Sequence, residues 1–194
     1  RRTPRPAEAS PLAGVDRGAI LAVAAVAVVD AVASGSVAAG LVAALAAVLV
    51  ALRLSRWHGL RTLRWPILWV LHLAYALIPL ALALKAVSLL AGAPWASAWL
   101  HLQLAGAVSL MIVAVMTRAT LGHTGRALVA APAAVAAYVL LLAAAFLRVF
   151  SGLVMEDAMP GLLAAGVCWV GAFGLLVVVY APMLLGPRAD GKAG

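Results

Sequence analysis

The sequence predicts an all-α fold, a polytopic transmembrane helix bundle, and three observations support this prediction. Of the 194 residues, 66% are hydrophobic and only 10% are charged, against roughly 25% charged residues in soluble domains. The mean hydropathy is +1.13. The apolar residues also lie in long runs, and about 20 such residues cross a hydrocarbon core of roughly 30 Å. We therefore expect the chain to lie in a lipid bilayer.

The apolar runs predict six membrane spans. The first two are rich in Ala and Val and are joined only by residues 34–36, which predicts a tight hairpin whose small residues let two backbones approach closely. Pro66 suits the first turn of the third span. Pro79 and Pro132 fall inside spans and predict kinks. The predicted spans are Gly18 to Ser34, Val37 to Leu54, Ile67 to Leu90, Ala96 to Thr117, Ala127 to Phe150 and Gly161 to Leu185.

The polar residues define the ends of the domain and its orientation. Residues 1–16 are polar and contain proline, which indicates a linker or a cut end rather than a signal peptide. Residues 17–186 form the transmembrane domain, and residues 187–194 form a polar tail. If six spans alternate, all Lys and Arg residues except Lys85 and Arg148 fall on one side. The positive-inside rule then predicts two cytoplasmic termini, in a bacterial inner membrane.

Other classes of function find little support in the composition. The net charge of +8 comes from residues that flank hydrophobic runs rather than forming one basic face, so no nucleic-acid partner is expected. Cys168 is the only cysteine, which excludes an intrachain disulfide and favours a small buried side chain. Glu156 and Asp157 are adjacent in a predicted outer loop and are expected to be solvated. No catalytic residue is assigned, and enzyme activity stays open.

Two histidines lie at membrane depth, where an imidazole is costly and is therefore a functional candidate. His72 lies near the cytoplasmic end of the third span, with Tyr75 one turn further on the same face. His101 lies near the periplasmic end of the fourth span. Each is a haem or copper ligand or, alternatively, a hydrogen-bonded packing residue. Because they differ in depth by roughly 10 Å or more, we expect two separate sites.

Two methionines follow on the fourth span. Met111 and Met116 offer thioether ligands for copper(I) or haem, although flexible core packing is the favoured interpretation.

Asp30 is the acidic residue deep in the first span. Lys85 and Arg148 are the only basic groups at its level, and a structural ion pair with one of them is the favoured interpretation. A proton-relay carboxylate is the alternative. The three residues together also define a second hypothesis, a metal-free transporter or channel with a polar path. A third hypothesis is a structural or assembly subunit that uses its small residues as packing faces.

A polar segment from Met116 to Arg126 separates the fourth and fifth spans. It holds Arg118, His123 and two glycines, which permit turns closed to other residues. Its donors and positive charge suit carboxylates or phosphates. We therefore expect a loop at the cytoplasmic membrane surface that clamps haem propionates. A basic loop that only sets the topology is the alternative.

The stretch "MIVAVMTRATLGHTGR", from Met111 to Arg126, resembles the signature of the NnrS family. These are membrane proteins associated with haem and copper and with the bacterial response to nitric oxide during denitrification. Three further pieces agree in order, and the resemblance runs from about Trp57 to the end of the chain. They are "RTLRWPILWVLHLAY" at Arg61 to Tyr75, His101 with Gly106 and Ala107, and "YAPMLLGPRADGKAG" from Tyr180.

The resemblance implies a haem- and copper-associated protein that lessens nitrosative stress by binding or processing nitric oxide or iron–nitrosyl species. It implies that this chain is the C-terminal half of a longer protein, so the missing N-terminal half is an expected partner beside the lipid bilayer. The positions that match the family pattern are His72, His101, Arg118, Gly122, His123, Gly125 and Arg126. We expect cofactor contacts from His72, His101, Arg118, His123 and Arg126, and metal ligands among His72, His101, Met111 and Met116.

Overall fold

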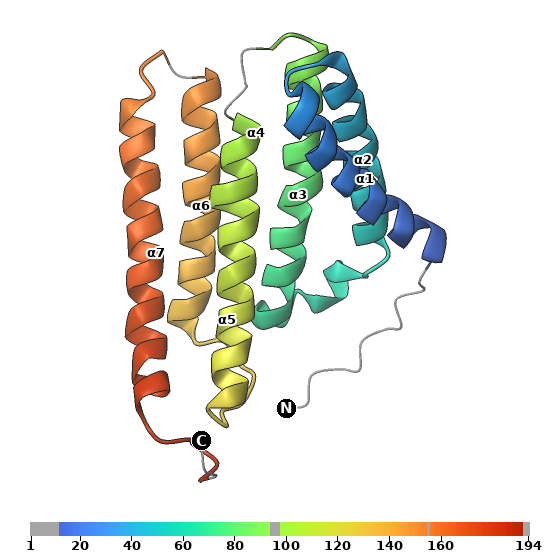
Figure 1. Cartoon of the computed structure of the whole chain (residues 1–194). Helices are drawn as coiled ribbons and strands as arrows, with labels where there is room; N and C mark the ends of the chain where they lie inside the picture. Colours follow the sequence, from blue (N-terminus) through green and yellow to red (C-terminus); the bar gives the residue numbers. More distant parts are fainter. Residues whose placement is uncertain (1–11, 94–97, 155, 192–194) are drawn as a thin grey trace.

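The computed structural model describes residues 12–93, 98–154 and 156–191, and it confirms an all-α fold for that part of the chain. The helices stand side by side in a bundle (Figure 1). Two short elements are not α-helical: η1 is a 3₁₀-helix and η2 is a π-helix. The elements in order are α1 (Ala13–Ala33), α2 (Val37–Ser55), η1 (Gly59–Thr62), α3 (Pro66–Leu90), α4 (Ala98–His101), η2 (Leu102–Val108), α5 (Ser109–His123), α6 (Pro132–Val154) and α7 (Met159–Leu185).

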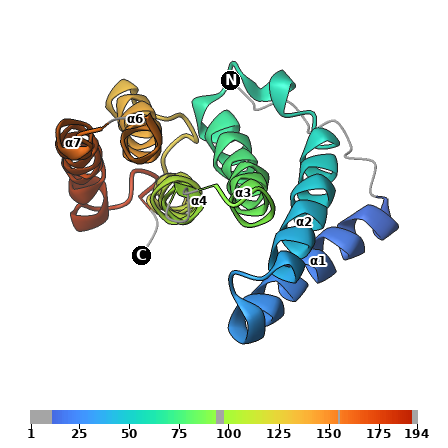
Figure 2. The same cartoon turned by 90° about the horizontal axis from the view of Figure 1, so that it is seen from above.

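One continuous helix, formed by α4, η2 and α5, runs through the middle of the bundle from Ala98 to His123. We call it the central helix. Figure 2 shows α3 on one side of it and α6 on the other, with α2 and α1 beyond α3 and α7 beyond α6. The main hydrophobic core joins α3, the central helix, α6 and α7. A smaller core joins α1, α2 and α3.

Within the residues that the structure describes, five helices are long and apolar enough to cross a membrane: α2, α3, the central helix, α6 and α7. The chain is therefore a multi-pass membrane protein. The first predicted span differs, because α1 carries Asp16, Arg17 and Asp30 within its length. A sixth span and the cytoplasmic side of the termini stay predictions.

The basic residues gather at one end of the bundle, the lower end in Figure 1, where α3 begins and α5 ends. This end is called the arginine end below. The arginines of this end lie near the start of α1, at the end of α2, in and after η1, near the end of α5 and after α7: Arg17, Arg53, Arg56, Arg61, Arg64, Arg118, Arg126 and Arg188.

The hairpin predicted between the first two spans is confirmed. Helix α2 starts after Ser36, whose side chain accepts a hydrogen bond from the Ala39 backbone N–H at 3.1 Å. Gly35 has φ = +83°, a conformation that glycine adopts without strain. Small buried alanines of both helices form the smaller core. Helix α1 begins at Ala13 rather than Gly18, and residues 1–11 of the predicted linker lie outside the described residues.

The boundary between the fourth and fifth spans differs from the prediction. Helix α5 continues to His123 instead of ending at Thr117, so much of the expected loop is helical. The hydroxyls of Thr117 and Thr124 donate to the carbonyls one turn earlier, at 2.8 and 2.7 Å. These bonds satisfy the polar side chains within the helix itself. The start of the fourth span predicted at Ala96 lies outside the described residues.

The start of α6 also differs from the prediction, and a proline explains the difference. Helix α6 begins at Pro132 rather than Ala127, so the kink predicted there is wrong. A proline at the start of a helix loses no hydrogen bond, because the first N–H groups have no partner within the helix. Pro66 begins α3 as predicted, and Pro79 lies inside α3.

Candidate functional site

His72 lies on the second turn of α3, at the arginine end. Its Nδ1 is 3.0 Å from the backbone carbonyl oxygen of Leu68. A carbonyl only accepts, so Nδ1 carries the proton and donates. In the neutral ring, Nε2 then keeps its lone pair, and it makes no hydrogen bond within the described residues. A histidine whose other nitrogen donates to a carbonyl has the tautomer found in metal ligands.

A cavity of about 390 Å³ adjoins this imidazole. Pockets for small molecules and cofactors measure roughly 300–1,000 Å³. Gly59 lies against the ring, because a Cβ placed on it would be 2.8 Å from Cδ2 of His72. Its lack of a side chain therefore lets the η1 segment approach the imidazole. The lining residues are Leu54, Ser55, Gly59, Leu60, Leu63, Trp69, His72, Leu73 and Ala76.

Side chains of α1, of α2 and of the turn after α2 form a group with Tyr75 and His72 of α3. Arg53 of α2 donates to Asp16 of α1 at 3.0 Å and to the hydroxyl of Tyr75 of α3 at 3.1 Å. The Trp57 ring meets His72 edge to face at a centroid distance of 6.1 Å and lies 4.5 Å from Tyr75. This group ties α1, α2 and α3 together beside the cavity.

Sequence reasoning identified Tyr75 but missed Asp16, Arg53 and Trp57. The available signal was the spacing of Arg53 and Trp57, which stand one helical turn apart at the end of α2.

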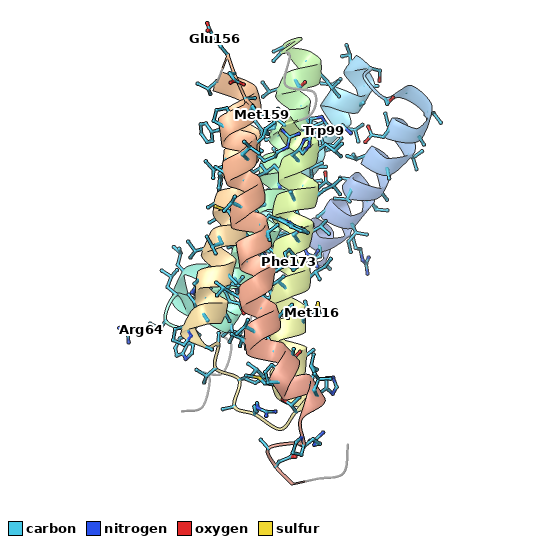
Figure 3. All side chains as sticks on the ribbon, turned by 90° about the vertical axis from the view of Figure 1, so that its left-hand side faces the viewer. Arg64, Trp99, Met116, Glu156, Met159 and Phe173 are labelled. Carbon is cyan, nitrogen blue, oxygen red and sulfur yellow. The ribbon has the colours of Figure 1, made fainter. Side chains whose placement is uncertain are left out.

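Positive charge lies on the segment that borders the same cavity. Arg61 and Arg64 are both exposed, and Figure 3 shows Arg64 projecting away from the bundle at this end. Guanidinium groups bind carboxylates with two parallel hydrogen bonds. The site thus combines an imidazole, apolar walls and nearby cations.

His101 ends α4, directly before the π-helix η2, and its side chain is half-buried. Helix α4 starts at the opposite end of the bundle from the start of α3 (Figure 1). π-Helices often occur at functional sites. Gly106 of η2 packs closely against α3 and α6, because a Cβ on it would be 3.1 Å from Leu77 and 3.2 Å from Ala145. Sequence patterns did not reveal η2.

The predicted metal ligands do not form one cluster. Among the residues that the structure describes, no three His, Cys, Asp or Glu side chains come together to hold a metal ion. Met111 is half-buried against the main core, whereas Met116 is 58% exposed and lines a different cavity. The ligand roles of His101, Met111 and Met116 stay predictions.

The residues of the family signature lie at the end of α5. Arg118 and His123 are exposed, and Nη1 of Arg126 is 3.4 Å from the Thr124 carbonyl. None of these three lines the cavity beside His72. Their predicted contact with haem propionates remains untested.

The C-terminal tail packs on this end of α5. Arg188 donates to the His123 carbonyl at 2.8 Å, and the Ala189 N–H donates to the Thr124 carbonyl at 2.9 Å. Arg188 also forms two hydrogen bonds with the Asp190 carboxylate, at 2.9 and 2.7 Å. The hydrogen bond to Asp190 raises the pKa of Arg188 above its ordinary value, so the guanidinium stays charged. A cation here also stabilises the negative end of the helix dipole.

The backbone conformation and the packing at position 125 both require glycine. Its φ is +70°, and a Cβ on it would be 2.6 Å from Cγ of Asp190. Only glycine therefore accommodates both the turn and the tail. This packing accounts for one of the two glycines in the signature.

The predicted ion pair of Asp30 is confirmed, and its partner is Lys85. The Lys85 Nζ donates to Oδ2 of Asp30, and it lies 4.4 Å from the centre of the Trp99 ring. Lys85 is only 3% exposed. Arg148 lies on α6 and forms no ion pair within the described ranges. The proton-relay and transporter hypotheses stay untested.

Comparison with known proteins adds one positive result. The model of the NnrS protein family matches residues 2–188, nearly the whole chain. The match starts well before Trp57, so α1 and α2 belong to the family region, contrary to the expected extent. No curated protein and no solved structure gives a significant match. The expected N-terminal half stays a prediction. With its bundle of membrane-spanning helices and this match, the chain belongs to the NnrS family.

Proposed function

We propose that this NnrS-type membrane protein binds haem through Nε2 of His72 and acts in the response to nitric oxide. One observation carries the proposal: the hydrogen bond from Nδ1 to Leu68 leaves Nε2 for a metal, beside a cavity of about 390 Å³. The imidazole nitrogen is a common ligand of haem iron. Bound haem would supply the iron that binds nitric oxide.

The surrounding residues suit this role. The apolar side chains of Leu54, Leu60 and Leu73 line the cavity and would contact the apolar face of a macrocycle. Trp57 meets the imidazole edge to face and Gly59 lies against its Cδ2, so both restrict its rotation. Arg61 and Arg64 offer cations for propionates at the arginine end.

The Arg53 network adds a second kind of support. It holds α1 and α2 against the face of α3 that carries His72 and Tyr75, through the bonds to Asp16 and the Tyr75 hydroxyl. The position of the imidazole is therefore fixed by the packing of three helices rather than by α3 alone. A ligand held this way needs little reorganisation when a metal binds.

Copper rests on weaker support. The family resemblance implies it, but the described residues bring together no three His, Cys, Asp or Glu side chains. We therefore propose no coordination site for copper. His101, next to η2, is the residue to test by copper analysis of a His101→Ala variant.

For the membrane location, we propose the bacterial inner membrane with the arginine end in the cytoplasm and with α1 as the sixth span. The one-sided arginines support this orientation. Labelling of single cysteines placed in the 34–36 hairpin, from either side of the membrane, tests it.

The haem proposal is tested by absorption spectroscopy of protein purified in detergent. We expect a Soret band in the wild type and a loss of haem affinity of more than about tenfold in His72→Ala. Imidazole added to His72→Gly should restore the band. His58→Ala is the matched control, because His58 is exposed at the same end of the bundle. A His72→Ala protein with full haem and an unchanged spectrum would overturn the assignment.

The nitric oxide proposal needs its own test. Adding nitric oxide to the haem-loaded wild type should shift the Soret band. Cells that carry His72→Ala should grow more slowly than wild-type cells under nitrosative stress, and cells that carry His58→Ala should not. A spectral response without any growth defect would leave haem binding intact and refute the proposed role.

A further inference from the structure

Residues 56–65 join α2 to α3 and cross the arginine end of the bundle (Figure 1). They are called the connecting segment below. Both α2 and α3 are long and apolar enough to span a membrane, and a short segment that joins the ends of two spans lies at the membrane surface. Trp57 and Trp65 stand near its two ends, and tryptophan is enriched at membrane–water interfaces. The side chains that the segment turns outward therefore meet the layer of lipid headgroups.

The connecting segment is built on a three-residue repeat. Its η1 part is a 3₁₀-helix, in which the Arg61 N–H donates to the His58 carbonyl at 2.9 Å. The same spacing continues beyond η1, where the Trp65 N–H donates to the Thr62 carbonyl at 2.8 Å. Residues three apart lie on the same side in this geometry. The segment therefore has three faces: positions 59, 62 and 65, positions 60 and 63, and positions 61 and 64.

The first face turns toward the bundle. Gly59, Thr62 and Trp65 are partly buried. Gly59 lies against the ring of His72, because a Cβ on it would be 2.8 Å from Cδ2. This contact fixes the rotation of the segment and leaves the other two faces exposed.

The second face is apolar. Leu60 and Leu63 border the cavity beside His72, yet they are 83% and 63% exposed. Exposure of leucine to water is unfavourable by an amount that grows with the exposed area. Just beneath the headgroups of a membrane the same side chains contact acyl chains instead, as the apolar faces of interfacial helices do.

The third face is cationic. Arg61 and Arg64 are both exposed, and Figure 3 shows Arg64 projecting away from the bundle. Neither arginine forms an ion pair within the ranges that the structure describes. The segment contains no Asp or Glu, so no carboxylate of its own neutralises them. Two guanidinium groups beside an apolar face suit the phosphate of a lipid.

We propose that the connecting segment lies in the headgroup layer and binds the phosphate of an anionic phospholipid through Arg61 and Arg64. Leu60 and Leu63 are inserted among the upper parts of the acyl chains. A protein partner fits this surface less well, because a stable interface buries about 800 Å² on each partner, far more than four side chains offer.

The lipid site is independent of the proposed haem binding. Arg61 and Arg64 are also the cations offered to haem propionates, so lipid binding is measured in His72→Ala as well as in the wild type. Both proteins should prefer the anionic lipid. A preference retained in His72→Ala supports the lipid site whether or not His72 binds haem, and a preference lost there would overturn it.

The depth of the segment is measured first. Leu60→Cys or Leu63→Cys, each in a Cys168→Ala background, carries an NBD fluorophore in nanodiscs of phosphatidylcholine and phosphatidylglycerol. Lipids with a nitroxide near the headgroup should quench the fluorophore more strongly than lipids with a nitroxide at the end of the acyl chain. Val170→Cys, exposed in the middle of α7, should show the reverse order. Both leucines are strongly exposed, so the labels should not disturb folding.

The lipid preference is measured with the nitroxide carried near the headgroup of either phosphatidylglycerol or phosphatidylcholine. Quenching of the fluorophore at position 60 during titration gives the relative affinity of the two lipids. Arg61→Gln/Arg64→Gln should lower the preference for phosphatidylglycerol at least about fivefold, because one arginine near an anionic surface contributes about that factor. Arg17→Gln/Arg118→Gln is the matched control, since it removes the same charge from exposed positions of the arginine end and should change the preference little.

Three further results would overturn the proposal. Fluorophores at positions 60 and 63 that aqueous iodide quenches and nitroxide lipids do not quench would place the segment in water. Fluorophores that neither quencher reaches would indicate contact with protein. An equal loss of preference in the two double variants would show that the general field of the arginine end, rather than the connecting segment, attracts the lipid.

Discussion

Neutralising Asp30 is the sharpest test of the packing in the membrane. In Asp30→Asn the Lys85 ammonium loses the negative charge of its partner and keeps a neutral amide oxygen and the contact with Trp99. Removing one partner of a buried ion pair destabilises a protein by about 3–5 kcal/mol, because the other charge stays buried. Lys85 is 3% exposed but Asp30 is 31% exposed, so we expect the lower limit, about 3 kcal/mol.

The expected change is measurable as a melting temperature. For a chain of this length, 1 kcal/mol corresponds to roughly 2–4 °C, so Asp30→Asn should lower Tm by about 6–12 °C. The double variant Asp30→Asn/Lys85→Met removes both charges and should recover most of that loss. Thermal unfolding in one detergent, followed by circular dichroism, compares the wild type, both single variants and the double variant.

The test also needs a control variant and a result that would refute it. Glu156→Gln removes an exposed acidic group and should leave Tm nearly unchanged. If the two single losses simply add in the double variant, the side chains are not coupled. The ion pair would then contribute nothing to the fold, and the reasoning from burial would be wrong.

Two further predictions concern the arginine end. Gly125→Ala should displace the C-terminal tail, because its Cβ would be 2.6 Å from Cγ of Asp190 at a φ of +70°. Trypsin should then cleave after Arg188 severalfold faster, and an unchanged rate would contradict the docking. Arg53→Met should lower Tm by roughly 2–4 °C, since it removes bonds to Asp16 and Tyr75 that are worth about 1 kcal/mol at this partly exposed position. An equal loss in the control Arg17→Met would show that this network contributes nothing specific.

Two kinds of feature could be predicted from the sequence: those that depend on hydropathy, and those that depend on the small number of charged groups within the apolar runs. Helix α2 begins at Val37 and helix α3 at Pro66, where the apolar runs also begin. The agreement arises because burial in lipid depends on composition and length. An ion pair of Asp30 with Lys85 or Arg148 was also predictable, since few basic groups occur at that depth and a lone charge there is costly, but only the structure identifies Lys85 as the partner.

Contacts that depend on how the helices face one another in the folded protein could not be predicted in the same way. The group of Arg53, Trp57 and His72 depends on how α1, α2 and α3 face one another, which hydropathy does not encode. Docking of Asp190 against Gly125 joins segments far apart in the chain. The signature from Met116 to Arg126 predicts a loop because it combines arginines, a histidine, threonines and two glycines. The threonine hydroxyls instead bond to the preceding turn, as in Thr117, and the helix continues.

The π-helix η2 sets the angular relation between the two halves of the central helix. Successive α-helical residues advance by about 100°, and a π segment holds an additional residue within its turn. Side chains after Val108 are thereby rotated by about one residue step relative to His101. A regular α-helix of the same sequence would turn Met116 and Thr117 about 100° away from their present direction, whereas deleting one residue from 102–108 would let the segment become α-helical and leave that direction unchanged. The additional residue in η2 thus sets the direction of the α5 side chains relative to the imidazole of His101.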